Sequence, residues 1–309
     1  MTRSRSAGLL VALGLSCVAT RAGAQAWLGA KGETTVSLTY QENNFQGHLD
    51  EKGKRDPHGS AQSQAMDLGI DYGVSDRLAL SFSVPYVAIR NGPDPSPVSG
   101  LKGNDDGHYH STWQDYHAEL RYNLLNAAFV VTPFVGAVIP THHYAVLAEA
   151  GQGRDLHEAQ IGINVGRLLS PQGHQPFLDA RFLYAVPERV RGISTNRLVA
   201  DGALGLFVTP GLSIRGLVNW QWTYGGLTAD QVFVFGPGGP PTQNPNLDDE
   251  LYRQHDRILQ DRHLRAGVAA SWALTGTTDL YGGFMSTVSG RGSHYGNAFS
   301  VGFARTLKR

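Results

Sequence analysis

The stretch DYHAELRYNLL, residues 115–125, has two faces of opposite character. Its charged and polar side chains occupy one set of alternate positions: Asp115, His117, Glu119, Arg121 and Asn123. Its apolar and aromatic side chains occupy the other set: Tyr116, Ala118, Leu120, Tyr122 and Leu124. A period of two residues is that of a β-strand, whose successive side chains point to opposite faces. A row of acids and bases opposite an aromatic-rich row predicts a strand that turns its apolar face to lipid and its charges to an interior.

Residues 1–24 are predicted to be a secretory signal peptide. Basic residues precede a short apolar run, Gly8 to Thr20, and a small-residue cleavage site, Ala22-Gly23-Ala24, follows it. The run is too short to cross a bilayer as a helix. Cys17 could mark a lipoprotein site, but Gly14 stands where a larger apolar residue is expected. We expect an exported chain whose residues 25–309 form a single outer-membrane β-barrel.

The composition narrows the class of protein. The only cysteine lies in the predicted signal peptide, so disulfide frameworks and cysteine-based metal sites are excluded from the mature chain. Lys and Arg number 26 and Asp and Glu also 26, a balance that gives no indication of a nucleic-acid partner. There are 38 Gly among 309 residues, against a usual share of about 7%. Glycine with Tyr and Trp in an exported chain favours a Gram-negative outer-membrane barrel, with a soluble periplasmic β-protein as the alternative.

Twelve stretches read as strands, each long enough for the roughly 9–11 residues that cross the hydrocarbon core. They are 33–45, 63–73, 76–89, 111–125, 127–139, 156–168, 174–186, 195–208, 211–224, 261–274, 276–289 and 294–307. Short turns alternate with long polar connections along most of the chain, as in outer-membrane barrels with short periplasmic turns. The short gap at 290–293 breaks this trend. An even number of strands puts both termini on the periplasmic side.

The apolar faces of these strands carry no charge in their central parts. In 211–224, for example, Ile214, Val218 and Trp222 alternate with Arg215 and Asn219. A Lys or Arg facing lipid at the midplane costs about 2–4 kcal/mol, which explains the separation. The stretch 127–139 is apolar on both faces, so its orientation stays open. Aromatic residues gather near strand ends, as expected for interfacial girdles.

The chain resembles an outer-membrane transporter-like barrel family associated with the phenol meta-cleavage degradation pathway. The resemblance covers most of the mature chain and consists of turns, prolines and aromatic residues. It is carried by 26–40 (AWLGAKGETTVSLTY), 67–87 (DLGIDYGVSDRLALSFSVPYV), 120–125 (LRYNLL), 131–144 (VTPFVGAVIPTHHY), 177–197 (FLDARFLYAVPERVRGISTNR) and 220–227 (WQWTYGGL). It implies an outer-membrane barrel with a role in uptake of small, often aromatic, molecules. It supplies no catalytic residues.

The predicted inward faces carry acids and bases in near balance. We expect a path for small anionic or aromatic solutes along five arginines: Arg121, Arg181, Arg197, Arg215 and Arg265. The accompanying polar residues of the path are Asp115, Glu119, Asp179, Asp201 and His117. Arg305 is also placed inward. The alternative is that these charges pair with one another and fill the barrel, because unpaired buried charges are costly.

Two groups of loop residues invite other interpretations. The connection 225–260 includes GPGGPPTQNPNLDDE, which predicts irregular structure, either a solvated loop or a lid over the mouth. His108 and His110 in one loop, and His142-His143 in another, would suit a metal, but no partners of fixed geometry accompany them. We predict no metal and no cofactor.

The competing classes are an outer-membrane hydrolase resembling the twelve-stranded phospholipase barrels, and a structural or adhesive barrel. A hydrolase needs a serine within hydrogen-bond reach of its histidine. His110-Ser111 and Ser293-His294 are adjacent in sequence, so the two side chains would point to opposite faces. We therefore expect a non-enzymatic channel whose partners are membrane lipids and a small solute, with the oligomeric state left open.

Overall fold

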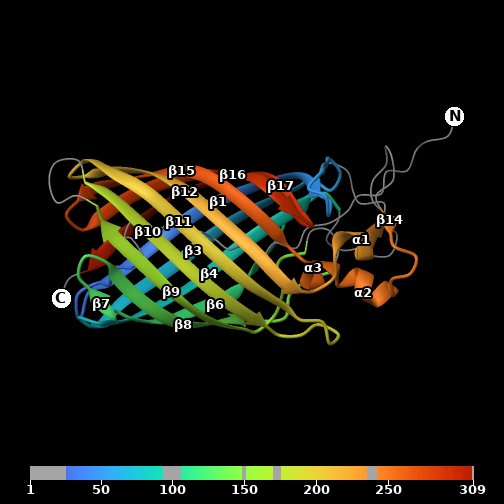
Figure 1. Cartoon of the computed structure of the whole chain (residues 1–309), viewed down its shortest axis with the longest axis horizontal. Coiled ribbons are helices and arrows are strands. Elements are labelled where there is room, and N and C mark those ends of the chain that lie inside the picture. The colour runs from blue at the N-terminus through green and yellow to red at the C-terminus, as the bar shows by residue number, and fades with distance from the viewer. Residues whose placement is uncertain (1–25, 93–105, 148–150, 170–174, 235–241, 308–309) are drawn as a thin grey trace.

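Twelve long strands close into one antiparallel barrel, as the sequence predicts (Figure 1). The structure is a computed structural model that describes residues 26–92, 106–147, 151–169, 175–234 and 242–307. The predicted signal peptide lies outside the described residues. None of the described helices is long and apolar enough to cross a membrane.

The barrel strands follow the predicted order, and most extend beyond the predicted bounds at one or both ends. They are β1 (Thr34–Leu49), β3 (Ala61–Ser75), β4 (Leu78–Asn91), β6 (Asp115–Tyr122), β8 (Val130–Pro140), β9 (Glu158–Leu168), β10 (Pro176–Pro187), β11 (Thr195–Thr209), β12 (Leu212–Gly225), β15 (Arg262–Thr275), β16 (Thr278–Arg291) and β17 (Ser293–Leu307). Short strands lie in the connections: β2 (Arg55–Asp56), β5 (His110–Trp113), β7 (Leu125–Asn126), β13 (Phe233–Val234) and β14 (Thr242–Gln243). Each barrel strand pairs with its sequence neighbour among these twelve, and β17 returns to pair with β1.

The closing seam between β1 and β17 runs from Thr34 opposite Leu307 to Leu49 opposite Ser293. One bulge interrupts it between Phe45 and Gly47. Gly47 has a φ of 149°, and a Cβ there would lie 2.0 Å from the carbonyl oxygen of Asp56. Only glycine therefore fits at this point of the seam.

The barrel exposes its apolar faces and covers its charges, the reverse of a soluble protein. On β6, Tyr116, Leu120 and Tyr122 are 40%, 41% and 43% exposed, whereas Arg121 is 7% exposed. This confirms the alternation predicted for residues 115–125. An outward band of exposed apolar side chains is what a bilayer requires of a barrel.

The structure settles the orientation of one strand that the sequence left open, and it corrects the predicted orientation of one arginine. On β8, Thr132 and Phe134 are buried and Val135 is 53% exposed, which settles the orientation of a strand whose sequence is apolar on both faces. Arg305, placed inward on sequence grounds, is exposed and lies on the same face of β17 as Phe303. It is at the end of the strand, where a long basic side chain can reach the membrane surface.

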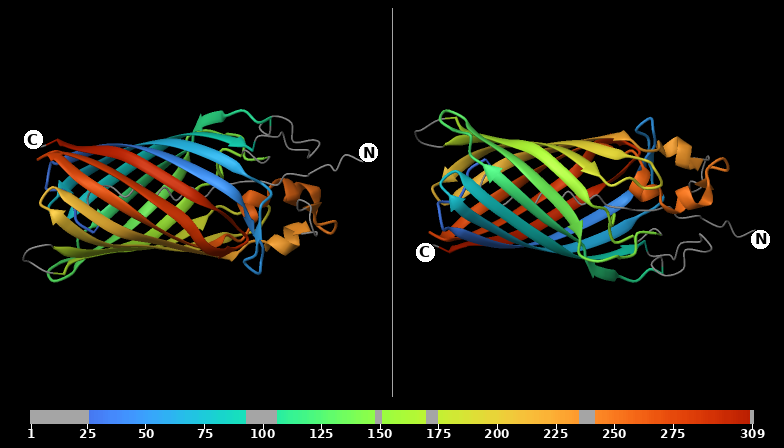
Figure 2. Two further views of the ribbon diagram at one scale, coloured as in Figure 1. Left: turned by 90° about the horizontal axis from the view of Figure 1, so that it is seen from above. Right: turned by 90° about the horizontal axis from the view of Figure 1, so that it is seen from below.

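The two ends of the barrel differ (Figure 2). Short turns join β3 to β4, β11 to β12 and β15 to β16 at one end, which is the periplasmic end by the usual rule for such barrels. The other end, called the outer end here, carries the long connections. The outer cap is the β12–β15 connection, residues 226–261, of which 235–241 lie outside the described residues. Its helices are α1 (Ala229–Val232), α2 (Asp249–Arg253) and α3 (His255–Ile258).

The outer cap is more regular than its glycine and proline content predicts. Thr228 and Gln231 form a reciprocal capping box that starts α1. Asp248 accepts from the backbone N–H groups of Glu250 and Leu251 and so starts α2.

Candidate solute path and its outer cap

The outer cap is anchored in the barrel mouth by buried apolar side chains. Phe233 and Tyr252 of the cap pack with Phe45 of β1, Ala61 of β3 and Ile89 of β4. Since the cap leaves from β12 and returns to β15, it reaches over the mouth to strands on the far side of the ring. Of the two sequence interpretations, the lid is the one that the described residues support.

A second apolar cluster fixes the other side of the cap. Ile258 of α3 is fully buried with Leu156 and Val190, which belong to the β8–β9 and β10–β11 connections. Leu227 packs against both clusters. The cap is therefore held from opposite sides of the mouth.

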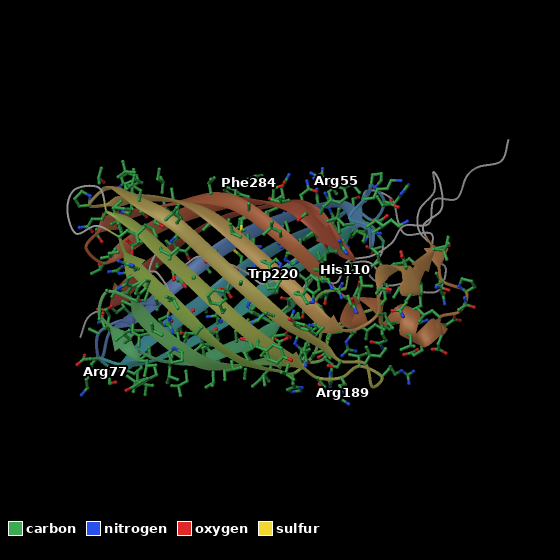
Figure 3. The ribbon with its side chains drawn as sticks, in the orientation of Figure 1. Arg55, Arg77, His110, Arg189, Trp220 and Phe284 are labelled. Atoms are coloured by element: carbon green, nitrogen blue, oxygen red, sulfur yellow. The ribbon has the colours of Figure 1, made fainter. Side chains whose placement is uncertain are left out.

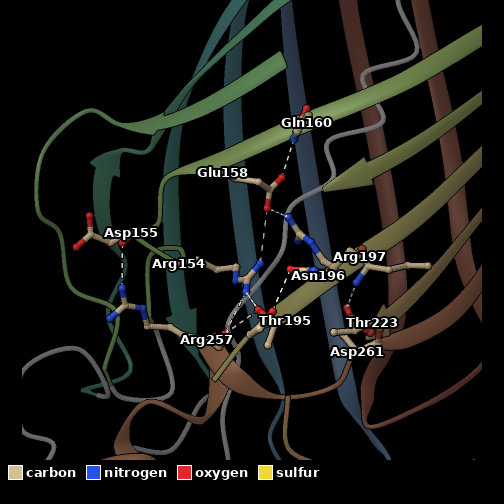
Figure 4. A network of polar contacts seen from close by, with 12 residues as sticks. Arg154, Asp155, Glu158, Gln160, Thr195, Asn196, Arg197, Thr223, Arg257 and Asp261 are labelled. Atoms are coloured by element: carbon tan, nitrogen blue, oxygen red, sulfur yellow. Dashed lines mark hydrogen bonds and ion pairs between the residues drawn. The ribbon is translucent and has the colours of Figure 1, made fainter. Parts of the chain in front are cut away.

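A polar network lies directly beneath the cap (Figure 4). Arg154, from the β8–β9 connection, donates to Thr195 Oγ1 over 2.6 Å and to the backbone oxygen of Arg257 over 3.0 Å. Arg257 donates in turn to the backbone oxygen of Asp155 over 3.0 Å. Burial, and then the charge of Arg197, lower the pKa of Arg154 to about 9. Two connections and the cap thus share one set of hydrogen bonds.

Glu158 links this network to the barrel wall. Its carboxylate accepts from Arg197 and lies 4.0 Å from Arg154, and Gln160 donates to it over 2.7 Å. The predicted path residue Arg197 is therefore engaged by an acid at the outer end of the lumen.

Asp115, another predicted path residue, is tied to the outer connections. Tyr144 Oη donates to Asp115 over 2.6 Å and accepts from the backbone N–H of Asp155 over 2.9 Å. Burial, and then the charge of Asp115, raise the pKa of Tyr144. His117 lies two positions further along the same inward face of β6 and is half-buried.

Two further arginines form ion pairs inside the barrel. Arg121 Nη2 lies 2.6 Å from Asp71 of β3. Arg181 Nη2 lies 2.5 Å from Glu119 of β6, and its guanidinium stacks 3.9 Å from the ring centre of Phe134. These pairs join strands that are not neighbours in the sheet, so they cross the lumen surface rather than run along one strand.

The other two predicted arginines, Arg215 and Arg265, lie on the neighbouring strands β12 and β15. Arg215 donates to Ser271 Oγ over 3.2 Å, and Asp179 acts on it electrostatically. Arg265 forms no ion pair within the described part of the chain, although the charge of Asp261 reaches it. Both line the wall formed by β12 and β15.

Asp201 belongs to a hydrogen-bonded chain on the same wall. Asn219 donates to Asp201 over 2.7 Å, and its amide oxygen lies 3.1 Å from His263 Nε2. His263 Nδ1 in turn lies 2.8 Å from Asp261. These hydrogen bonds form a continuous series from Asp201 in the lumen to Asp261 at the base of the outer cap.

One part of the inner wall is lined largely by small neutral polar side chains, and Asp71 of β3 lies among them. This wall lies on β1, β3 and β4, and its neutral side chains are Ser37, Thr39, Gln41, Asn43, Ser63 and Ser81, all buried within the barrel. Thr39 Oγ1 lies 2.7 Å from the hydroxyl of Tyr281. Sequence reasoning overlooked this wall, although the alternation from Ser37 to Asn43 was a visible signal.

The inner end of the lumen holds the start of the described chain. Ala26 is fully buried, and Thr132 Oγ1 of β8 donates to its carbonyl oxygen over 2.6 Å. A Cβ at Gly166 of β9 would lie 2.3 Å from the ring of Trp27, so glycine makes room for the indole. Nothing in the sequence pattern pointed to this contact.

The loop histidines have separate partners. His110 Nε2 lies 2.9 Å from Asp106, His142 Nε2 lies 3.0 Å from Thr112, and His143 Nδ1 lies 3.0 Å from Asp155. Within the described ranges no three His, Cys, Asp or Glu side chains are grouped to hold a metal. Ser111 bonds the hydroxyl of Tyr86 over 2.6 Å instead of facing His110.

Three solved structures align with this chain. The COG4313 outer membrane channel from Pseudomonas putida F1 aligns with a TM-score of 0.67 at 14% identity, over 92% of this chain and 98% of that chain. The NanC porin aligns at 0.47 with 10% identity over 89% and 100%, and the β domain of the Bordetella autotransporter BrkA at 0.48 with 11% identity over 90% and 100%. No family model and no curated protein matches the chain. The closed barrel and its exposed apolar band place the chain in the outer membrane.

Proposed function

We propose that this protein is an outer-membrane channel that admits small molecules, with aromatic or anionic ones as the favoured class. The observation that carries the proposal is the contrast between two inner walls. Small hydroxyl and amide groups line much of β1, β3 and β4, where Asp71 also lies, whereas the five predicted arginines lie on β6, β10, β11, β12 and β15. A barrel that served only as a scaffold could be filled with apolar side chains, but this interior offers hydrogen bonds to a solute.

The solute class follows from how the arginines are presented. Guanidinium groups bind planar carboxylates through paired hydrogen bonds and stack on aromatic rings. The stacking of Arg181 on Phe134 is one such arrangement inside the barrel. Arg215 and Arg265 lie on the neighbouring strands β12 and β15, where Arg215 donates to the neutral Ser271, so we assign this wall the main contacts with solute. The resemblance to a family associated with phenol degradation supports an aromatic solute.

The fold of a protein described as an outer membrane channel supports transport rather than catalysis. The contacts of His110 and Ser111 give the hydrolase interpretation no support, because each side chain bonds a different partner. We therefore infer a non-enzymatic role.

Solute flux into liposomes carrying the refolded protein tests the proposal. Benzoate, benzyl alcohol and a sugar of similar size would be compared. We expect benzoate to enter fastest, and Arg215→Ser and Arg265→Ser to reduce its advantage over the sugar. Arg77→Ser, in the periplasmic turn (Figure 3), is the matched control and should leave the ratio unchanged. Equal entry of all three solutes would contradict the selectivity, and no entry above empty liposomes would contradict the channel.

A further inference from the structure

A basic patch lies on the outward face at the outer end of the barrel, away from the lumen. It consists of Lys52, Lys54, Arg55, Arg262 and Arg291, which we call the rim patch. Arg262 and Arg291 are direct partners on β15 and β16. Their outward direction follows from Arg262 alternating with His263, which faces the lumen and bonds Asn219. Figure 3 shows Arg55 at this end.

Like charges directly opposite one another on neighbouring strands destabilise a sheet. Elsewhere in this barrel arginines are neutralised by acids, as Arg121 is by Asp71. In the described chain no rim-patch residue forms an ion pair. The pair Arg262–Arg291 therefore places two positive charges side by side without an ion-pair partner among the described residues.

The acids that are nearest in sequence are already engaged. Asp50 accepts from the backbone N–H groups of Lys52 and Lys54 over 2.9 and 2.8 Å. Glu51 accepts from the backbone N–H of Ala229 in the outer cap over 2.7 Å. Asp56 lies 2.5 Å from His58. These contacts hold the carboxylates in place but leave them charged, so the five basic residues of the patch outnumber the three neighbouring acids by two.

Aromatic rings hold two of the arginines in place. The guanidinium of Arg262 lies 4.4 Å from the ring centre of Trp222, its partner on β12. That of Arg55 lies 5.1 Å from the ring centre of Tyr295, which is 8% exposed. The β1–β2 hairpin lies beside the β16–β17 turn, since a Cβ at Gly53 would be 3.2 Å from the carbonyl oxygen of Gly290. The hairpin that carries Lys52, Lys54 and Arg55 therefore lies next to the strand end that carries Arg291.

We propose that the rim patch binds the phosphate groups of a phosphorylated glycolipid in the outer leaflet. An arginine side chain binds phosphate with two parallel hydrogen bonds. The exposed Arg291 is the principal donor, and Arg262, which already donates from Nη2 to Gln260, contributes its remaining N–H groups. The position at the outer girdle puts these donors at headgroup level, and the exposed apolar strands below offer a surface for acyl chains. Neither the solute path nor the proposed transport is needed for this binding.

Native mass spectrometry of the full chain in detergent, without divalent cations, tests the site. The probes are lipid A carrying both phosphates, lipid A from which the phosphates have been removed, and inorganic phosphate. We expect the phosphorylated lipid to remain bound to the unmodified protein. The double variant Arg262→Gln/Arg291→Gln should bind it roughly tenfold more weakly, which is the affinity lost with one charge-assisted hydrogen bond. Arg167→Gln is the matched control, because Arg167 stacks 4.5 Å from Phe129 at the opposite rim.

Folding of each variant is checked by heat-modifiable migration on a gel. If the double variant fails to fold, Lys52→Gln/Lys54→Gln/Arg55→Gln, on the exposed hairpin, is expected to weaken lipid binding in its place. Equal binding of both lipids, or unchanged binding by a folded variant, would overturn the proposal. Inorganic phosphate that competes as well as the lipid would also overturn it, by showing a site for free phosphate.

Discussion

The backbone N–H of Ala229, the first residue of α1, donates to Glu51 Oε1 over 2.7 Å, joining residues 178 positions apart. The contact ties the outer cap to the connection that follows β1. It is the polar counterpart of the apolar cluster around Phe233. The cap is thus held to the barrel rim as well as to its inner wall.

Glu51→Ala should loosen the outer cap. A hydrogen bond to a charged group is worth about 1.5–3 kcal/mol, and this one has no substitute in the variant. We expect larger and more frequent opening steps in single-channel recordings. Asp76→Ala, in the β3–β4 turn at the other end, should leave the recordings unchanged. Identical recordings for both variants would mean that Glu51 does not restrain the cap.

Phe233→Ala should undock the cap while leaving the barrel folded. Phe233 is 4% exposed and packs on the rings of Tyr252 and His255, with ring centres 6.0 and 5.2 Å away. Truncating a buried phenylalanine costs about 3–5 kcal/mol. We expect rapid tryptic cleavage within α2 and α3 and an otherwise resistant barrel. Val234→Ala, at a position that is 45% exposed, is the control, and a cap equally resistant in both would contradict the prediction.

The base of the cap should loosen in acid. Burial alone raises the pKa of Asp261, but the charge and hydrogen bond of His263 outweigh burial and lower the pKa to about 2. A carboxyl with a depressed folded pKa contributes stability above its unfolded pKa, and this contribution is lost as pH falls through the folded value. We therefore expect pepsin to cut the cap faster at about pH 2 than at about pH 4, the ordinary carboxyl range.

Asp261→Asn should remove that pH dependence. The carboxamide keeps the size of the side chain but cannot titrate, so the ratio of the two cleavage rates should fall to the ratio that pepsin shows on an unstructured peptide. A variant that retained the full difference between the two pH values would show that another group is responsible.

Glu119→Gln should destabilise the barrel by removing the carboxylate that pairs with Arg181. The two side chains are 21% and 12% exposed, and breaking a buried ion pair by removing one partner costs about 3–5 kcal/mol. Urea unfolding in vesicles measures the loss. Glu119→Gln/Arg181→Met should recover much of it, because replacing both charges removes the uncompensated one. If the double variant were as unstable as the single one, the pair would not be the cause.

The barrel could be predicted from the sequence because its governing constraint is local. Lipid contact forces a period of two on every strand, and Arg121 beside Tyr122 shows that period without any knowledge of partners. The tight turns could be predicted for the same reason, because Pro210 and its neighbours separate two strands directly. Strand 127–139 resisted orientation because both of its faces are apolar, and only its register with β6 and β9 resolved it.

The contacts of the candidate site were harder to predict because they join residues that are far apart in the sequence. Arg181 and Glu119 are 62 positions apart, and no pattern in the sequence selects Glu119 among the available acids. The capping box at Thr228 and Gln231 was a readable signal for α1, but glycine and proline in the same connection obscured it. Arg305 was misplaced because it lies near a strand end, where a charge on the lipid-facing side is inexpensive.

The seam between β1 and β17 sets the order in which this molecule can be made. Thr34 of β1 pairs with Leu307 of β17. The first barrel strand to be synthesised therefore lacks one of its two neighbours until the last strand has been made. Until then β1 and β16 are open sheet edges, able to capture strands of other chains. Such distant pairing also gives a high contact order and slow closure. The polypeptide therefore depends on protection in transit, and a chain truncated before β17 should be discarded rather than inserted.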